Sequence, residues 1–184
     1  MMRDTESMLI HTATGTAIPA VHARPVPPVT PRHDFYAFVH KGLRAFLADT
    51  LVAAGRTDPY DDREVAQLAT RLRSLCALYR LHAAKEDRFI HTAMEARRPG
   101  SSRRTAADHL QHARALDRLE ADTDTLEASS GSARGEAAKT LYRELALFAA
   151  DDFVHMDAEE VENGAVLWAC YKDEELAQIE RESA

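Results

Sequence analysis

Four long segments almost free of proline and glycine constrain the fold of this chain more than any other feature. Only two of the seven prolines lie beyond residue 32, and the long segments are rich in Ala, Leu, Arg and Glu, which favour helices. No stretch shows the sustained alternation that is typical of a β-strand. The sequence predicts helices near residues 33–53, 62–96, 103–128 and 136–162, followed by a short helix near 172–183.

Turn-like segments separate the predicted helices at residues 54–62, 97–104 and 129–135. The pair Asn163 and Gly164 is expected to end the fourth helix, and Asp173 is expected to cap the short last one. Long helices that are joined by short connections become antiparallel neighbours. The predicted fold class is therefore all-α, an up-down-up-down antiparallel four-helix bundle with a Pro-rich N-terminal arm and a short C-terminal helix.

The other five prolines lie within residues 1–31, which we expect to form an extended arm, and residues 32–184 are expected to form the bundle domain. The formal net charge of −7 argues against a nucleic-acid surface and against binding to anionic lipid. The sequence lacks the apolar run of a secretory signal or of a membrane span. Two cysteines are too few for a disulfide framework, so we expect reduced thiols in a cytoplasmic protein.

A histidine precedes a glutamate by four residues at three places: His82 with Glu86, His91 with Glu95, and His155 with Glu159. Spacing alone cannot separate a metal-binding pair from a chance pair in a chain with nine histidines and many acids. Helical position can separate them, because inward positions of a bundle recur every three or four residues.

Inward stripes on all four predicted helices contain histidine. On the second helix the stripe is Leu72, Leu75, Tyr79, His82, Glu86, Phe89 and Ala93, and on the fourth it is Leu141, Leu145, Phe148, Asp152, His155 and Glu159. The first helix contributes Tyr36, His40, Leu43 and Leu47, and the third contributes His109, His112, Leu116, Leu119, Thr123 and Leu126. His91 lies nine residues after His82, which places it on the opposite face of a regular helix, so we expect His91 and Glu95 to form a solvated surface or rim pair.

Two glutamates and several histidines in one core indicate a metal site. Burying an ionised carboxylate costs several kcal/mol unless it is paired or bound to metal, and no inward Lys or Arg is available at these levels. Imidazole with carboxylate suits Fe, Mn or Zn. Two carboxylates that can each bridge two ions favour a dinuclear centre with open coordination positions. Neither the His-Glu-x-x-His of zinc proteases nor the Glu-x-x-His of ferritin-like proteins is present.

The ordered set of His40, His82-x-x-x-Glu86, His109 and His155-x-x-x-Glu159 resembles the hemerythrin-like HHE cation-binding domain family over roughly residues 32–180. The resemblance implies a non-heme centre of two Fe ions that is oxo- or hydroxo-bridged. It implies bridging carboxylates from Glu86 and Glu159. It also implies terminal ligands from His40, His82, His109 and His155.

Two positions depart from the pattern of the oxygen-carrying hemerythrins. Those proteins have a second histidine four residues after the one at position 109, where this chain has Ala113, and His112 is the alternative one position earlier. They also place the last carboxylate five residues after its histidine, at the position of Glu160. We expect Glu159 instead, because it lies about 40° from His155 around a helix and Glu160 lies about 140° away. Glu160 becomes the alternative if the helix contains a bulge.

The expected function is binding or sensing of O₂, or of related small molecules such as NO or iron. The alternative is a catalase-like enzyme that decomposes H₂O₂ at the same centre, so the sequence leaves enzymatic activity open. A metal-free interaction bundle is disfavoured by the buried glutamates. Tyr36 could donate a hydrogen bond to a bound oxygen species, although a core role is more common for such a residue. We expect no nucleic acid or membrane partner, and a sensor would signal through a protein partner or a homo-oligomer.

Overall fold

The computed structural model of the protein describes residues 32–183, and residues 32–184 form one compact unit. The described residues are helical apart from their connections, without a strand, which confirms the all-α class. The elements are α1 (Ala37–Arg56), α2 (Asp62–Lys85), the π-helix η1 (Glu86–His91), α3 (Thr92–Arg97), α4 (Arg103–Ala128), α5 (Gly131–Ala158), the π-helix η2 (Glu159–Asn163), α6 (Gly164–Cys170) and α7 (Asp173–Ser183). The expected arm, with His11 and His22, lies outside the described residues.

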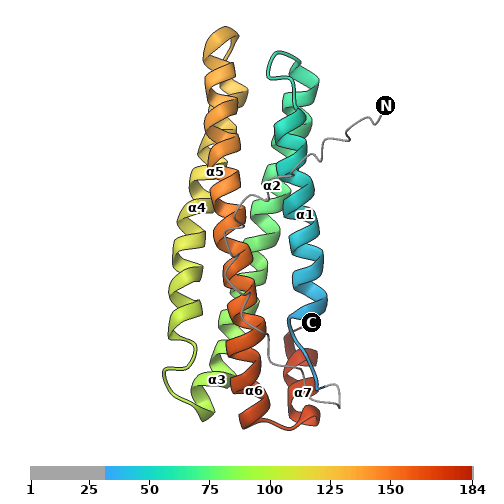
Figure 1. Ribbon diagram of the computed structural model, residues 1–184, viewed down its shortest axis with the longest axis vertical. Helices are drawn as coiled ribbons and strands as arrows, with labels where there is room; N and C mark the ends of the chain where they lie inside the picture. The colour runs from blue at the N-terminus through green and yellow to red at the C-terminus, as the bar shows by residue number, and fades with distance from the viewer. Residues whose placement is uncertain (1–31, 184) are drawn as a thin grey trace, which may run out of the picture. The chain divides into compact units, whose positions relative to one another are not determined.

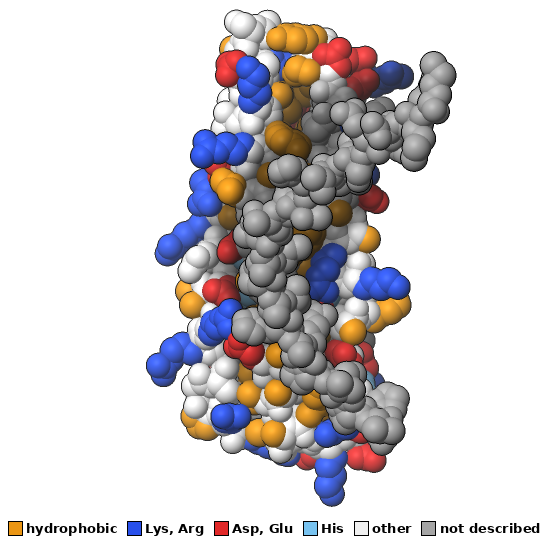
Figure 2. All heavy atoms as spheres, in the orientation of Figure 1, with side chains coloured by type: hydrophobic (Ala, Val, Ile, Leu, Met, Phe, Trp, Pro, Cys, Tyr) orange, Lys and Arg blue, Asp and Glu red, His pale blue; other side chains and the backbone are white. Residues whose placement is uncertain are grey.

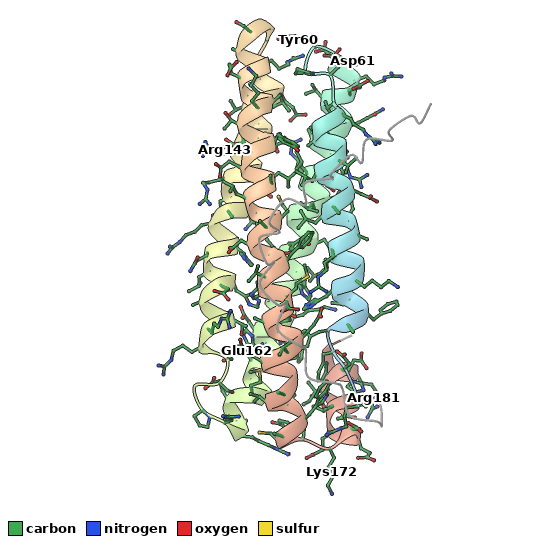
Figure 3. All side chains as sticks on the ribbon, viewed as in Figure 1. Tyr60, Asp61, Arg143, Glu162, Lys172 and Arg181 are labelled. Carbon is green, nitrogen blue, oxygen red and sulfur yellow. The ribbon has the colours of Figure 1, made fainter. Side chains whose placement is uncertain are left out.

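The helices α1, α2, α4 and α5 lie side by side (Figure 1). Each packs against two others, in the order α1, α2, α4, α5 and back to α1. The connections α1–α2 and α4–α5 lie at one end, where Figure 3 labels Tyr60 and Asp61, and α3, α6 and α7 lie at the other, near Lys172 and Arg181. Within the described residues no helix combines the length and apolarity that crossing a membrane requires.

Side-chain caps fix where two of the long helices begin. Asp61 accepts hydrogen bonds from the backbone amides of Arg63 and Glu64 at 2.8 and 3.2 Å, which satisfies free amides of the first turn of α2. Helix α1 begins at residue 37 rather than at the expected residue 33, because Asp34 holds the preceding turn. Its carboxylate accepts from the amides of Tyr36 and Ala37 at 2.8 and 3.1 Å.

The fourth predicted helix is longer than expected at both ends. It begins at Gly131, whose φ of +53° completes the turn, so a loop reaching residue 135 was a wrong prediction. The expected stop at Asn163 and Gly164 was also wrong, since the helix continues through η2 and α6 to Cys170. Asn163 is buried, and its amide turns inward instead of capping the helix.

Each of the two π-helices is a single wide turn within a longer helix. The helix of residues 62–97 contains η1, which begins at Glu86, and the helix of residues 131–170 contains η2, which begins at Glu159. A π-turn adds one residue, so positions beyond it rotate by about 100° relative to a continuous α-helix. These turns therefore change which side chains of the following segment face the core.

The core has two parts. The larger lies among the four long helices and consists mainly of leucines with Cys76, Tyr79, Phe148 and Met156. The smaller joins the start of α1 to α3, α6 and α7 and contains Tyr36, Ile90, Met94, Leu167 and Leu176, with Trp168 and Tyr171 packed against it. Trp168 and Tyr171 thus pack over the end of the bundle. The indole of Trp168 donates to the carbonyl of His33 at 2.8 Å. Charged side chains are spread over the face that Figure 2 shows.

Candidate metal centre

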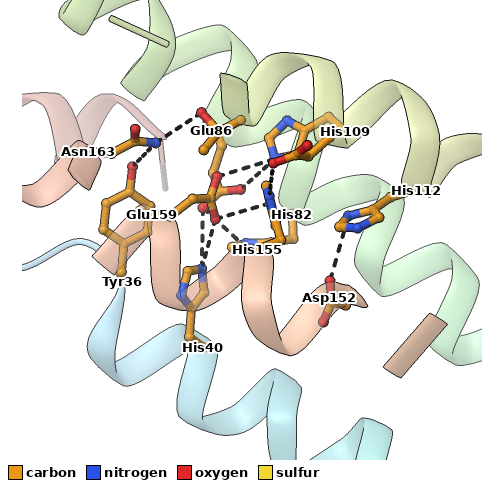
Figure 4. Close-up of polar contacts among 12 residues, drawn as sticks. Tyr36, His40, His82, Glu86, His109, His112, Asp152, His155, Glu159 and Asn163 are labelled. Atoms are coloured by element: carbon orange, nitrogen blue, oxygen red, sulfur yellow. Dashed lines mark hydrogen bonds and ion pairs between the residues drawn. The ribbon is translucent and has the colours of Figure 1, made fainter. Parts of the chain in front are cut away.

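The six residues with predicted ligand roles lie together between the four long helices (Figure 4). His40 comes from α1, His82 from the last turn of α2, and His109 from α4, while His155 lies in the last turn of α5. Glu86 and Glu159 are the first residues of η1 and η2. Five of the six side chains are buried, and His82 is the partly exposed member.

Each glutamate is surrounded by three imidazoles. For Glu86 the nearest oxygen-to-Nε2 distances are 3.5 Å to His40, 3.3 Å to His82 and 3.4 Å to His109. For Glu159 the matching distances are 3.5 Å to His40, 3.4 Å to His109 and 3.3 Å to His155. Glu159 belongs to two of the three groups of side chains with metal-binding spacing, one with His40, His82 and Glu86, the other with His109 and His155. The third group consists of Asp87, His91 and His109.

These side-chain atoms fit a metal better than they fit one another. Seven buried atoms here have no hydrogen-bond partner among the described residues: Nε2 of His40, His82 and His109, and both carboxylate oxygens of Glu86 and Glu159. Buried polar atoms rarely stay unpaired, because the loss of hydration is not offset. Two ligand atoms about 2.1 Å from one ion lie roughly 3.0 to 3.4 Å apart at angles of about 90° to 109°. The separations above are close to that range.

In the protein alone, the buried carboxylates of Glu86 and Glu159 repel each other. Burial and repulsion from the Glu86 carboxylate raise the pKa of Glu159 to about 7. Burial lowers the pKa of His109, but Glu159 and Glu86 more than offset this and raise it to about 11. Burial lowers the pKa of His155 to about 3, and the neighbouring His112 and His109 add to this shift. Cations between the carboxylates would remove their mutual repulsion and would bind imidazole without a proton.

Three carboxylates outside the cluster orient three of its imidazoles. Nδ1 of His109 donates to Asp87 at 2.8 Å, Nδ1 of His155 lies 3.4 Å from Asp108, and Nδ1 of His40 lies 3.2 Å from Glu160. A proton on Nδ1 leaves Nε2 with its lone pair directed at the two glutamates, which is the arrangement of a metal-binding histidine. Sequence reasoning assigned no role to Asp87 or Asp108, because their partners lie on other helices.

The third pair with this spacing, His91 with Glu95, lies outside the six-residue cluster as expected, but its environment differs from the expected one. His91 is buried, so the prediction of a solvated pair with Glu95 was wrong. Nine residues of an α-helix leave His91 about 180° from His82 around the axis, but the extra residue of η1 reduces this offset to about 80° and turns His91 inward. Glu95 instead accepts hydrogen bonds from the amides of Gly100 and Ser102 at 2.6 and 3.0 Å.

A buried hydrogen-bond network next to the cluster was not predicted. Nδ2 of Asn163 donates to Oγ1 of Thr105 at 3.2 Å and, weakly, to the hydroxyl of Tyr36 at 3.4 Å. Nε2 of His91 lies 3.1 Å from the same Thr105 oxygen. Tyr36 is a core residue at 1% exposure, with its ring centroid 5.1 Å from that of His40. An inward Asn163 could be predicted only from a π-turn, and the sequence has no clear signal for one.

The two alternative ligand positions lie outside the six-residue cluster. His112 is buried, with Nε2 3.1 Å from Asp151 and Nδ1 3.8 Å from Asp152. Glu160 lies behind His40 and forms an ion pair with Arg44, although its helix does contain the bulge. The bulge begins at Glu159, which stays aligned with His155 and 3.3 Å from it.

Comparison with known proteins agrees with this geometry. No curated protein matches the sequence. The family model described as the hemerythrin HHE cation-binding domain matches residues 33–163, which include all six clustered residues and both π-helices. This match covers most of the chain, and it confirms the resemblance seen in the sequence. The protein belongs to the hemerythrin HHE cation-binding domain family.

Proposed function

We propose that this protein is a cytoplasmic non-heme di-iron protein that binds or senses O₂ or a related small molecule such as NO. In this proposal one ion would be held by His40, His82, Glu86 and Glu159. The second would be held by His109, His155 and Glu159. The observation that carries the proposal is the convergence of seven buried, unpartnered nitrogen and oxygen atoms from four helices.

The ligand types suggest reactivity rather than a purely structural site. Four imidazoles and two carboxylates are too few to fill the coordination of two six-coordinate ions, which leaves positions for small molecules. Two ferrous ions there would supply two electrons to bound O₂. Five of the six proposed ligand side chains are buried, and Asp87, Asp108 and Glu160 hold the imidazoles in the ligating tautomer.

Metal analysis tests the ligand assignment. We expect the purified protein to contain about two irons per chain, and the Glu95→Ala protein to contain the same amount, because Glu95 lies outside the cluster. A loss of iron in Glu95→Ala, or a wild-type protein without iron after growth in iron-rich medium, would contradict the proposal.

The small-molecule role is tested on the iron-loaded protein. A binding or sensing role predicts an absorption change on exposure to air that reverses under argon over repeated cycles. The catalase-like alternative predicts steady O₂ evolution from added H₂O₂ over many turnovers. Absence of both, with full iron content, would reject both roles and leave a cation-binding bundle.

A further inference from the structure

A cavity between α2 and α4 has no role in the proposal above. It has a volume of about 230 Å³ and extends inward to α5. Its lining includes the rings of His82, His109 and His155, so it reaches the side of the six-residue cluster. Its mouth is bordered by Ala83, Ala84 and Ala113, whose small side chains leave a gap between the two helices.

Side chains at the rim are held away from the mouth. Arg80, which is long enough to cover the opening, instead forms ion pairs with Asp117 and Glu120 on α4 at 2.8 and 2.9 Å. Asp87 is held by the Nδ1 atoms of His109 and His91 at 2.8 and 2.9 Å. The cavity is thus open in the folded protein without a movement of the backbone.

The walls and the inner end of the cavity differ in chemistry. Leu110, Leu116 and Met156 contribute apolar surface. The inner end contains Asp152, which is 2% exposed and whose Oδ2 has no hydrogen-bond partner among the described residues. Burial raises the pKa of Asp152 to about 7, so its carboxyl group can donate a hydrogen bond near neutral pH. Oδ1 of Asp152 faces Nδ1 of His112 at 3.8 Å, whereas a buried Oδ2 without a partner at the end of an apolar cavity indicates a ligand with one polar group.

The volume sets the size of that ligand. One water molecule takes about 30 Å³ of liquid, and a cavity of about 150 Å³ suffices for benzene. The cavity is therefore larger than O₂, NO or H₂O₂ requires, and the carboxylate of Asp87 in its lining disfavours an anion.

We propose that this cavity binds a small uncharged molecule with an apolar body and one hydroxyl or hydroperoxyl group. In this proposal Asp152 is the hydrogen-bonding partner at the inner end, and the oxygen of the ligand lies beside the His109 and His155 rings. The inference deepens the proposed function by giving the substrate class of the same centre, and it rests on that function only for what happens to the ligand afterwards.

Binding is tested by methyl NMR of the full-length zinc-loaded protein, in which the metal is redox-inert, with phenol and benzene as probes. We expect both probes to shift the methyl signals of Met156, Leu116 and Ala113 in a saturable way. Ala113→Leu should abolish these shifts because it fills the mouth. Ala107→Leu, a matched change at an exposed position of α4 outside the cavity, should leave them intact.

Substitution of Asp152 tests the hydrogen bond. Asp152→Leu should weaken phenol binding about tenfold and change benzene binding by less than about twofold, and Asp152→Asn should restore most of the phenol affinity. Equal losses for both probes in Asp152→Leu, equal binding in Ala113→Leu, or shifts confined to other methyl groups would overturn the proposal.

The same proteins separate this proposal from the proposed function. Ala113→Leu should keep its full iron content, because Ala113 is not among the six clustered residues. A protein that binds the probes but no iron would refute the di-iron function and leave the pocket established. A protein that holds iron but binds neither probe would refute the pocket alone.

Discussion

The two interrupted helices, residues 62–97 and 131–170, place a histidine and a glutamate in the cluster by the same arrangement. In each, a histidine lies in the last α-helical turn, and the glutamate four residues later begins a π-turn. Each then turns a polar side chain inward at the end of the π-turn, His91 in one helix and Asn163 in the other. The difference lies in that last residue.

The two inward residues meet at one atom. His91 and Asn163 both contact Oγ1 of Thr105 on α4, at 3.1 and 3.2 Å. Each π-turn leaves its glutamate aligned with the histidine four residues before it and turns the residue at its own end toward Thr105. The extra residue in each helix therefore changes the orientation of the segment after the glutamate and not that of the glutamate.

The largest expected effect distinguishes the two glutamates. Glu159 belongs to two of the three groups with metal-binding spacing, and Glu86 belongs to one. Glu159→Ala should therefore lose nearly all bound iron, and Glu86→Ala should retain a residual fraction at the His109 and His155 side. The measurement is iron per chain after desalting, and full iron content in Glu159→Ala would show that the assignment is wrong.

A smaller effect is expected from the outer carboxylates. Asp87 lies 2.8 Å from His109, and Asp108 lies 3.4 Å from His155. Loss of such a partner weakens metal binding by about 10- to 100-fold, so Asp87→Asn should approach the upper value and Asp108→Asn the lower. Competition with a chelator of known affinity measures both. The opposite order would show that hydrogen-bond length does not govern the difference.

The hydrogen bonds of His91 and Asn163 with Thr105 are expected to contribute to stability. Thr105→Val keeps the shape but removes the partner of two buried groups, which should lower the free energy of unfolding by about 2 kcal/mol. Thr125→Val is the control on the same helix, because Thr125 is exposed there, and it should change the value by less than about 0.5 kcal/mol. Urea unfolding at equal metal content compares them. Equal effects from the two substitutions would contradict a stabilising role of the hydrogen bonds to Thr105.

The smallest effect concerns Glu95, the member of the third pair that faces a loop. Backbone amides of Gly100 and Ser102, and then the Ser102 hydroxyl, lower the pKa of Glu95 from 4.5 to about 2. A carboxylate with a lowered pKa in the folded state stabilises it above the ordinary pKa, and this contribution is lost as the pH falls toward the folded value. The stability difference between wild type and Glu95→Gln should therefore shrink between pH 6 and pH 3. A difference that stays constant over that range would contradict the role of the ionised form.

Most of the fold and the inward stripes followed from the sequence because both depend on local periodicity. The inward residues of the first, third and fourth stripes are all buried, including His40, His109 and His155. Helical periodicity also predicted metal-binding pairs at His82 with Glu86 and at His155 with Glu159, and not at the third pair. The two predicted pairs lie in the cluster. Their ligand roles stay a prediction until metal is measured.

The missed features share one physical origin. A π-turn is stabilised by its surroundings rather than by residue type, so it leaves no clear trace in one sequence, and everything beyond it is rotated. The burial of His91 and the inward Asn163 follow from that rotation. The roles of Asp87 and Asp108 were missed for a different reason, since each acts across helices, and only a packed structure brings their partners together.

The contacts of Arg32 have a consequence for how the bundle comes apart. Its guanidinium donates to Asp173 at 2.7 Å and to the carbonyls of Trp168 and Tyr171 at 3.2 and 2.8 Å, so the segment before α1 is fastened to the last two helices. These hydrogen bonds join the first and last described segments of the domain. Release of α7 therefore also releases the segment before α1, and amide exchange at both places should follow one common rate.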